Sequence, residues 1–87
     1  MKLKIFWQED CPRCPAAKKL GKELEMEGVE VCYYDVKTLE GLAEASFYSV
    51  SSTPGIIIVN DDDEEIAGWR GTTPTKEEIY SYLNKGE

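Results

Sequence analysis

The chain has 87 residues, of which 41% are hydrophobic and 31% charged, enough for one small globular domain over residues 1–87 but not for a second core. Its formal net charge of −7 argues against binding to nucleic acid or to an anionic membrane surface. There is no histidine, which excludes hydrolases built on Ser-His-Asp or Cys-His arrangements and the usual zinc enzymes. No apolar stretch approaches the ~20 residues that a membrane-spanning helix needs.

The first predicted element is a strand over residues 3–7, whose nearly all apolar sequence is typical of a buried central strand. A helix is predicted to start in the motif Cys-Pro-Arg-Cys at residues 11–14, with Pro12 in the first helical position, where no backbone N–H is needed. Gly28 is expected to end this helix. Helical spacing predicts that its inward stripe consists of Ala16, Ala17, Leu20 and Leu24.

Three more elements are predicted in the middle of the chain. Residues 29–36 are rich in β-branched and aromatic side chains and are predicted to form a strand. A helix is predicted over residues 39–48, with the packing positions Leu42, Ala43, Ala45 and Phe47. Residues 51–55 break the helical pattern and lead into a fully apolar strand at residues 56–59.

The last part of the chain is predicted to form a hairpin and a helix. The preceding strand is expected to return as a second, antiparallel strand at residues 65–70. We interpret the acidic run at residues 61–65 as a solvated hairpin tip rather than a metal site. The final helix is predicted over residues 75–84, starting in a capping box at Thr75 or, alternatively, with Thr73 as its cap.

These elements follow the order β-α-β-α-β-β-α, which indicates the α/β class. The first two strands flank a helix, so we expect them to be parallel, with a right-handed crossover. The last two strands are joined by a short turn and are expected to be antiparallel. We therefore predict a mixed four-stranded sheet in the strand order 2-1-3-4, flanked by helices.

The pair Cys11 and Cys14 is the strongest functional signal in the chain. Two thiols three positions apart, at the start of a helix that follows a strand, are placed to exchange electrons with other disulfides. The chain is therefore a candidate thiol–disulfide oxidoreductase. Unpaired N–H groups at the helix start, together with the positive charge of Arg13, are expected to lower the pKa of the Cys11 thiol. Cys14 lies about one helical turn further on and is expected to be shielded.

The cysteines have two alternative interpretations, metal binding and an inert pair. Structural zinc needs four ligands, and the chain offers one close pair plus Cys32, so we expect no metal site. Cys32 lies within a predicted strand and is expected to pack as a small hydrophobic residue. The odd count of three cysteines, and a first strand with no signal peptide ahead of it, favour a reducing cytoplasm.

Together these features resemble the thioredoxin fold of the small thioredoxin/glutaredoxin-like proteins. The resemblance covers residues 2–83. It depends on a first strand that ends in Phe6-Trp7, on the cysteine motif that opens a helix, and on Thr53-Pro54 ahead of an apolar strand. A hairpin and a final helix complete the match, which implies that the whole chain adopts the thioredoxin fold.

The resemblance also implies roles for residues near the cysteines. Cys11 matches the nucleophilic cysteine of the family, and Cys14 matches its resolving cysteine. Pro12 and Arg13, which lie between them, would set the redox poise. Trp7 matches an active-site tryptophan, four residues ahead of the first cysteine.

Three further positions match the substrate groove of the family. Pro54 matches a proline whose preceding peptide bond is cis, and Gly71 matches a glycine beside the groove. A cis bond would bring backbone groups of Thr53 beside Cys11, where an extended substrate chain could pair as an added strand.

The sequence departs from the family at the positions that handle protons. Thioredoxins carry a buried acidic residue late in the first strand and a supporting lysine, and these positions are Ile5 and Val31 here. Water, Glu9 or Asp10 would then have to serve the resolving cysteine. Glutaredoxins often carry a basic residue three positions ahead of the first cysteine, where this chain has Gln8, and their Gly-Gly-x-x-Asp stretch has no match.

The resemblance implies a cytoplasmic, monomeric oxidoreductase that acts on protein disulfides, with a role in electron transport and redox homeostasis. It would need no bound cofactor besides the cysteine pair. Its electrons would come from a reductase of the thioredoxin-reductase type or from glutathione. The alternatives are a glutathione-dependent, glutaredoxin-like reductase and a non-catalytic binding module of the same fold.

Overall fold

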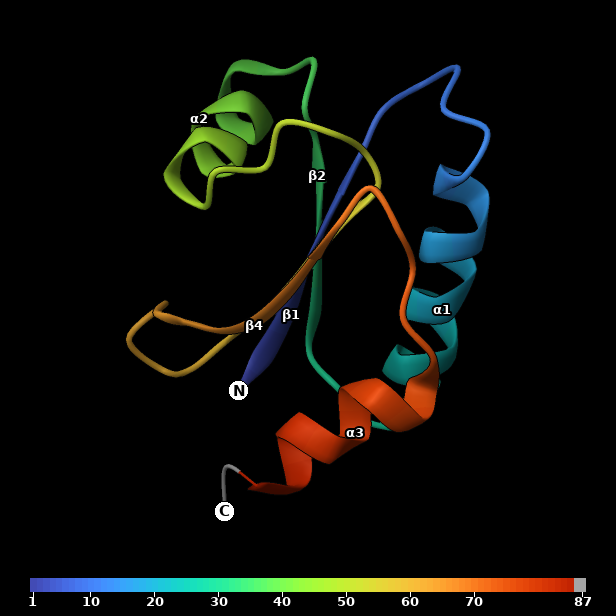
Figure 1. The fold of residues 1–87 in the computed structure, drawn as a ribbon, viewed down its shortest axis with the longest axis vertical. Coiled ribbons are helices and arrows are strands. Elements are labelled where there is room, and N and C mark those ends of the chain that lie inside the picture. The colour runs from blue at the N-terminus through green and yellow to red at the C-terminus, as the bar shows by residue number, and fades with distance from the viewer. Residues whose placement is uncertain (86–87) are drawn as a thin grey trace.

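A computed structural model of the chain describes residues 1–85. Its elements, in chain order, are β1 (Lys2–Trp7), α1 (Cys14–Met26), β2 (Val31–Asp35), α2 (Leu39–Phe47), β3 (Gly55–Val59), β4 (Glu65–Arg70) and α3 (Lys76–Lys85). The strands form one four-stranded sheet in the order β2-β1-β3-β4, as predicted (Figure 1). β1 runs parallel to β2, and β3 is antiparallel to both of its neighbours.

The sheet separates two apolar clusters. On one face α1 and α3 cover a cluster formed by Leu3, Ile5, Ala17, Leu20, Leu24, Ile56, Ile58 and Ile79. On the other face α2 covers a smaller cluster formed by Phe6, Ala45, Tyr48, Val50, Ile57 and Val59. The central strands β1 and β3 are therefore buried on both faces, which explains why their sequences are almost continuously apolar.

The helix α1 begins later than predicted. Cys14 is its first residue and Arg13 its cap, so Pro12 lies in the turn before the helix and not in the first helical position. Pro15 is instead the second residue of the helix, in the first turn, where a missing N–H leaves no hydrogen bond unmade. Gly28 follows the helix with φ +96°, the left-handed conformation expected of a residue that ends a helix.

The inward face of α1 also differs at three positions from the prediction. Ala17, Leu20 and Leu24 are buried as expected, but Ala16 is exposed. Cys14 and Gly21 complete the buried face. In the described residues 1–85, no helix has both the length and the apolar character needed to cross a membrane.

The predicted packing face of α2 is largely wrong. Ala45 is buried, but Ala43 is exposed, and Leu42 and Phe47 are 55% and 73% exposed. The helix instead approaches the end of β2 through Gly41, which lies so close to the backbone carbonyl of Asp35 that a Cβ there would collide with it. The close approach along small residues turns the large apolar side chains outward.

A buried charge links α2 to the sheet. Lys4 of β1 is 4% exposed, and its Nζ donates hydrogen bonds to Glu44 Oε1 at 2.7 Å and to Tyr48 Oη at 3.2 Å. Burial alone would lower the pKa of Lys4, but the bonds to Glu44 and Tyr48 outweigh it and raise the pKa. Tyr48 Oη in turn donates to the carbonyl of Asp63 in the hairpin turn at 2.7 Å.

The final helix starts in the capping box, the first of the two predicted starts. The backbone N–H of Glu78 donates to Thr75 Oγ1 at 3.1 Å, and the N–H of Thr75 donates back to Glu78 Oε1 at 3.3 Å. Ile79 then packs into the cluster beneath α1. At the outer end of that cluster, Glu27 accepts hydrogen bonds from Lys76 and Tyr80, which fasten α3 to the end of α1.

Candidate active site

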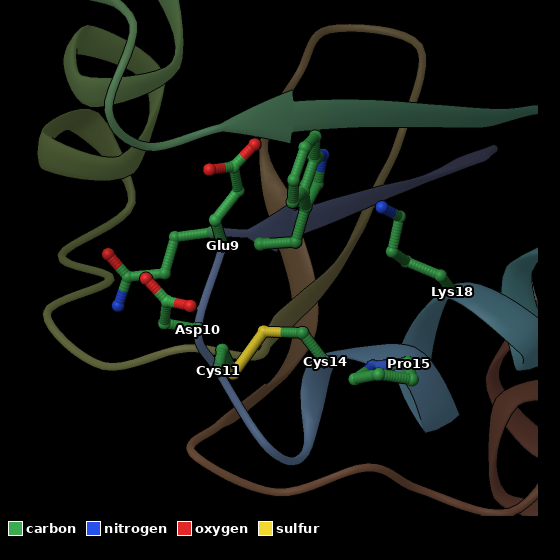
Figure 2. A pocket seen from close by; sticks show the side chains of 8 residues that line it. Glu9, Asp10, Cys11, Cys14, Pro15 and Lys18 are labelled. Carbon is green, nitrogen blue, oxygen red and sulfur yellow. A yellow bond between two sulfur atoms is a disulfide. The ribbon is translucent and has the colours of Figure 1, made fainter.

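Cys11 and Cys14 form a disulfide in the segment that joins β1 to α1 (Figure 2). Their Cα atoms are 5.4 Å apart, within the normal range for a disulfide. Cys11 is half-buried, whereas Cys14 is 2% exposed. An attacking or attacked sulfur from another molecule therefore has easier access to Cys11.

The disulfide borders an open pocket of about 510 Å³. Its walls come from the end of β1, the following loop and the first turn of α1: Trp7, Gln8, Glu9, Asp10, Cys11, Cys14, Pro15 and Lys18. Figure 2 shows Lys18 extending from α1 on the same side as the cysteine pair. The ammonium group of Lys18 lies 3.6 Å from the centre of the Trp7 ring, a cation–π contact.

The peptide bond between Thr53 and Pro54 is cis, the form that the resemblance implied. Two hydrogen bonds hold the segment against its neighbours. Gln8 Nε2 donates to Thr53 Oγ1 at 2.9 Å, and the N–H of Gly71 donates to the carbonyl of Pro54 at 2.8 Å. These two bonds connect the segment around the cis bond to the end of β1 and to the segment after β4.

Arg13 of the cysteine motif also bonds to the segment after β4. Its Nη1 donates to the carbonyl of Gly71 at 3.3 Å, although 58 residues separate the two in sequence. Gly71 has φ +82°, a conformation that favours glycine. The sequence-predicted positions Arg13 and Pro54 are therefore linked through the backbone of the third, Gly71.

On the face of the sheet under α1, the two positions where thioredoxins carry ionisable side chains are apolar here. Ile5 is fully buried in the cluster under α1, and Val31 packs against the same cluster. The carboxylates close to the disulfide are those of Glu9 and Asp10, which are exposed on the wall of the pocket. Within residues 1–85, no three His, Cys, Asp or Glu side chains gather closely enough to hold a metal ion.

Comparison with known proteins agrees with this geometry. A family model described as "Thioredoxin domain" matches residues 1–84. A thioredoxin of Methanocaldococcus jannaschii is 35% identical over 88 aligned residues, which cover 98% of this chain and 94% of the relative. The chain belongs to the thioredoxin family. A probable thioredoxin of Archaeoglobus fulgidus is 37% identical over 57 residues, which cover 64% of this chain and 63% of that protein.

Solved thioredoxin structures share the fold at low sequence identity. Thioredoxin-2 of the malaria parasite superposes with a TM-score of 0.77 at 19% identity, over 95% of this chain and 80% of that one. Thioredoxin 1 of Thermosipho africanus superposes with a TM-score of 0.68 at 19% identity, over 99% and 93% of the two chains. The predicted thioredoxin fold is thereby confirmed.

Two residues of this thioredoxin-family site were not predicted from the sequence as part of it. Gln8 follows Trp7 directly, yet only the structure shows that it bonds to Thr53. Lys18 lies four residues after Cys14, a spacing that places both on one face of a helix and that could have indicated its presence in the pocket.

A second hollow adjoins the first. It measures about 300 Å³ and shares Gln8 with the disulfide pocket. It is lined by the apolar residues Val36, Leu42, Ala45 and Val50 together with Gln8 and residues 51–53. In this thioredoxin-family chain, the segment before the cis bond thus borders a partly apolar recess that meets the disulfide pocket at Gln8.

Proposed function

We propose that this chain is a thiol–disulfide oxidoreductase that reduces disulfides of other proteins through Cys11 and Cys14. Family membership supports thiol–disulfide chemistry in general. The observation that supports the specific proposal most strongly is the Cys11–Cys14 bridge itself, with one sulfur accessible and one buried beside an open pocket. A couple of this kind can pass two electrons without any bound cofactor.

The proposed reaction has two exchange steps. The Cys11 thiolate attacks one sulfur of the substrate disulfide, and the other substrate sulfur leaves with the electron pair and takes a proton from water. Cys14 then loses its proton and attacks Cys11 Sγ, so that the mixed disulfide breaks and the second substrate sulfur leaves as a thiolate that is protonated. The substrate gains two electrons and two protons, and the Cys11–Cys14 bridge forms.

A protein substrate suits the surface beside Pro54. We propose that an extended segment of the substrate pairs with the backbone of Thr53, as strands add to a sheet edge. A neighbouring apolar side chain of the segment would enter the recess formed by Val36, Ala45 and Val50. The recess favours a polypeptide with an apolar side chain, a contact that glutathione, which has none, could not make.

A reductase protein is the electron donor that we favour over glutathione. Glutathione is a net anion, and this chain carries a net charge of −7. The overall repulsion between the two slows their encounter. We further propose that the protein works as a monomer in a reducing cytoplasm, where such self-repelling surfaces keep small proteins apart.

Trapping experiments test the proposed function. Cys14→Ser should accumulate a mixed disulfide with a protein substrate such as insulin, because the resolving step is lost. Cys11→Ser should trap nothing, since the accessible nucleophile is gone. Gel shift without reductant and mass spectrometry measure the adducts. The Cys32→Ser variant is the matched control and should turn over insulin like the unmodified chain.

Two results would contradict the proposal. If Cys11→Ser traps the substrate and Cys14→Ser does not, the two roles are reversed. If the unmodified protein reduces insulin neither with a thioredoxin-type reductase nor with glutathione and its reductase, while remaining folded, the chain is a non-catalytic binding module. Activity with glutathione alone would favour the glutaredoxin-like alternative.

A further inference from the structure

In the second exchange step Cys14 must react as a thiolate, and the core of this protein supplies no group that stabilises this anion. Cys14 is 2% exposed, and a buried thiolate has little water to stabilise it. At the two strand positions where thioredoxins carry ionisable residues, this chain has Ile5 and Val31, which can neither accept a proton nor stabilise an anion. The hydroxyl of Tyr33 on the same face donates to Glu25 instead. The start of α1 favours an anion at Cys14, but the reduced pair needs further help if it is to resolve mixed disulfides quickly at neutral pH.

Lys18 is the residue placed to give that help. It lies one turn after Cys14 on α1, where side chains four residues apart are neighbours on one helix face. Its side chain is half-buried and lines the same pocket as both cysteines (Figure 2). The Trp7 ring, 3.6 Å from the ammonium group, holds the charge in place and limits its contact with water.

The charge of Lys18 is not neutralised by an ion pair with a described residue. Among residues 1–85 the lysines that pair with carboxylates are Lys2, Lys4, Lys22 and Lys76. The other charged groups around the disulfide are Glu9 and Asp10 on the pocket wall and Arg13 in the cysteine motif. The two carboxylates are exposed and screened by water, and Arg13 is directed to the carbonyl of Gly71.

We propose that the ammonium group of Lys18 stabilises the thiolate of Cys14 and so promotes the step in which Cys14 displaces the substrate from Cys11. This role rests on the proposed function. The proton of Cys14 passes to water, and the charge left on its sulfur is opposed by Lys18 until the sulfur forms the bond to Cys11. Lys18 itself neither gains nor loses a proton.

The resolving step can be followed with Ellman's reagent, supplied in less than equimolar amount to the reduced protein. Cys11 attacks the reagent and releases one thionitrobenzoate, and Cys14 then displaces the second from Cys11. The absorbance of the released dye thus rises in two phases, and the second phase reports Cys14. A Cys32→Ala background leaves only the two active-site thiols to react.

Three variants isolate the charge of Lys18. Lys18→Met keeps a long apolar stem against Trp7 and removes the charge, whereas Lys18→Arg keeps the charge. Lys19→Met makes the same change in net charge at the next, exposed position. Near-ultraviolet circular dichroism shows whether each variant retains the packing of Trp7.

For Lys18→Met we expect the midpoint of the pH profile of the second phase to rise by about one unit, the effect of losing a partly screened charge one turn away. At pH 7 the second phase should be about threefold slower, because the smaller thiolate fraction is partly offset by its greater nucleophilicity. Above both midpoints Lys18→Met should be the faster protein, so that the two profiles cross. Lys18→Arg should restore the unmodified profile, and Lys19→Met should not change it.

The proposal is overturned if the profile of Lys18→Met coincides with that of Lys19→Met. It is also overturned if Lys18→Met slows the second phase equally at every pH, which would indicate a purely structural role. The absence of any second phase in the unmodified protein is a different result, since it would contradict the proposed function itself.

Discussion

At the scale of single residues, the backbone of Gly71 connects the cysteine motif to the segment around the cis bond. It donates to Pro54 and accepts from Arg13, and it does so at φ +82°. Gly28 has a similar φ of +96° but lies at the far end of α1 with open space around it. Substitutions at the two glycines can therefore distinguish a loss of stability through backbone strain from a change in the site.

We expect Gly28→Ala and Gly71→Ala each to lower the free energy of unfolding by about 1 kcal/mol, the cost of a left-handed conformation with a Cβ. Gly71→Ala should also slow insulin reduction, because its Cβ would lie 3.2 Å from Ser52 Oγ and shift the segment next to Pro54. Gly28→Ala should leave turnover unchanged. Urea unfolding and insulin assays measure both effects, and equal turnover in the two variants would show that Gly71 does not shape the site.

Much of the site could be predicted at this scale, and the limits have a physical cause. The spacing of Cys11 and Cys14 and the Thr-Pro step are local signals, so they can be recognised in the sequence. The bond from Gln8 to Thr53 and the bond from Arg13 to Gly71 join residues 45 and 58 positions apart. Such contacts depend on the final placement of loops, which no local pattern encodes.

At the scale of elements, the position of α2 depends on the bond between Lys4 and Glu44. Lys4 is enclosed, whereas the side chain of Glu44 is 34% exposed. Removing one member of the pair therefore has a different cost depending on which charge is left behind, because an enclosed ammonium cannot regain water but a half-exposed carboxylate can.

We expect Glu44→Ala to lower the free energy of unfolding by about 2 kcal/mol, because it leaves the buried ammonium of Lys4 with only the hydroxyl of Tyr48 and a carboxylate oxygen of Asp63 at 3.9 Å. Lys4→Met should cost under ~1 kcal/mol, since methionine fills a similar volume and Glu44 can be hydrated. Glu40→Ala on the exposed side of α2 is the control, with a loss of under ~1 kcal/mol from the helix N-terminus. Chemical denaturation measures all three, and a larger loss for Lys4→Met than for Glu44→Ala would contradict this account.

The elements show where sequence patterns succeed and where they fail. The strand order and all seven elements were predicted, because β3 is apolar throughout, β1 is apolar from residue 5 to residue 7, and the turns carry glycine, proline and acidic residues. The predicted packing face of α2 is wrong because the prediction follows hydrophobicity, which favours Leu42 and Phe47 as buried residues. Packing followed the close approach that Gly41 allows, which depends on the neighbouring carbonyl of Asp35.

At the scale of the whole molecule, the redox state should change stability as well as reactivity. A small domain buries only about 60–65% of its unfolded surface, so its free energy of unfolding is small. The bridge closes a loop between residues only three positions apart. By the chain-entropy relation, closing a loop that short raises the free energy of unfolding by about 2 kcal/mol.

We therefore expect the oxidised protein to be about 2 kcal/mol more stable than the reduced protein. Urea unfolding with and without a reductant measures the difference. Cys14→Ser, which has no bridge to lose, is the control and should unfold alike under both conditions. Equal stability of the two redox states of the unmodified chain would show that the reduced form makes compensating contacts.

The isoleucine at position 5 also affects how the stability of the molecule responds to pH. A carboxylic acid buried there would have a raised pKa, so the free energy of unfolding would fall as the pH rises from the ordinary pKa of the acid to the raised one. Ile5 removes this dependence, and the hydroxyl of Tyr33 on the same face of the sheet donates to Glu25 and has a pKa raised by burial. The free energy of unfolding is therefore not reduced by a buried acid at this position as the solution passes from acidic to neutral pH.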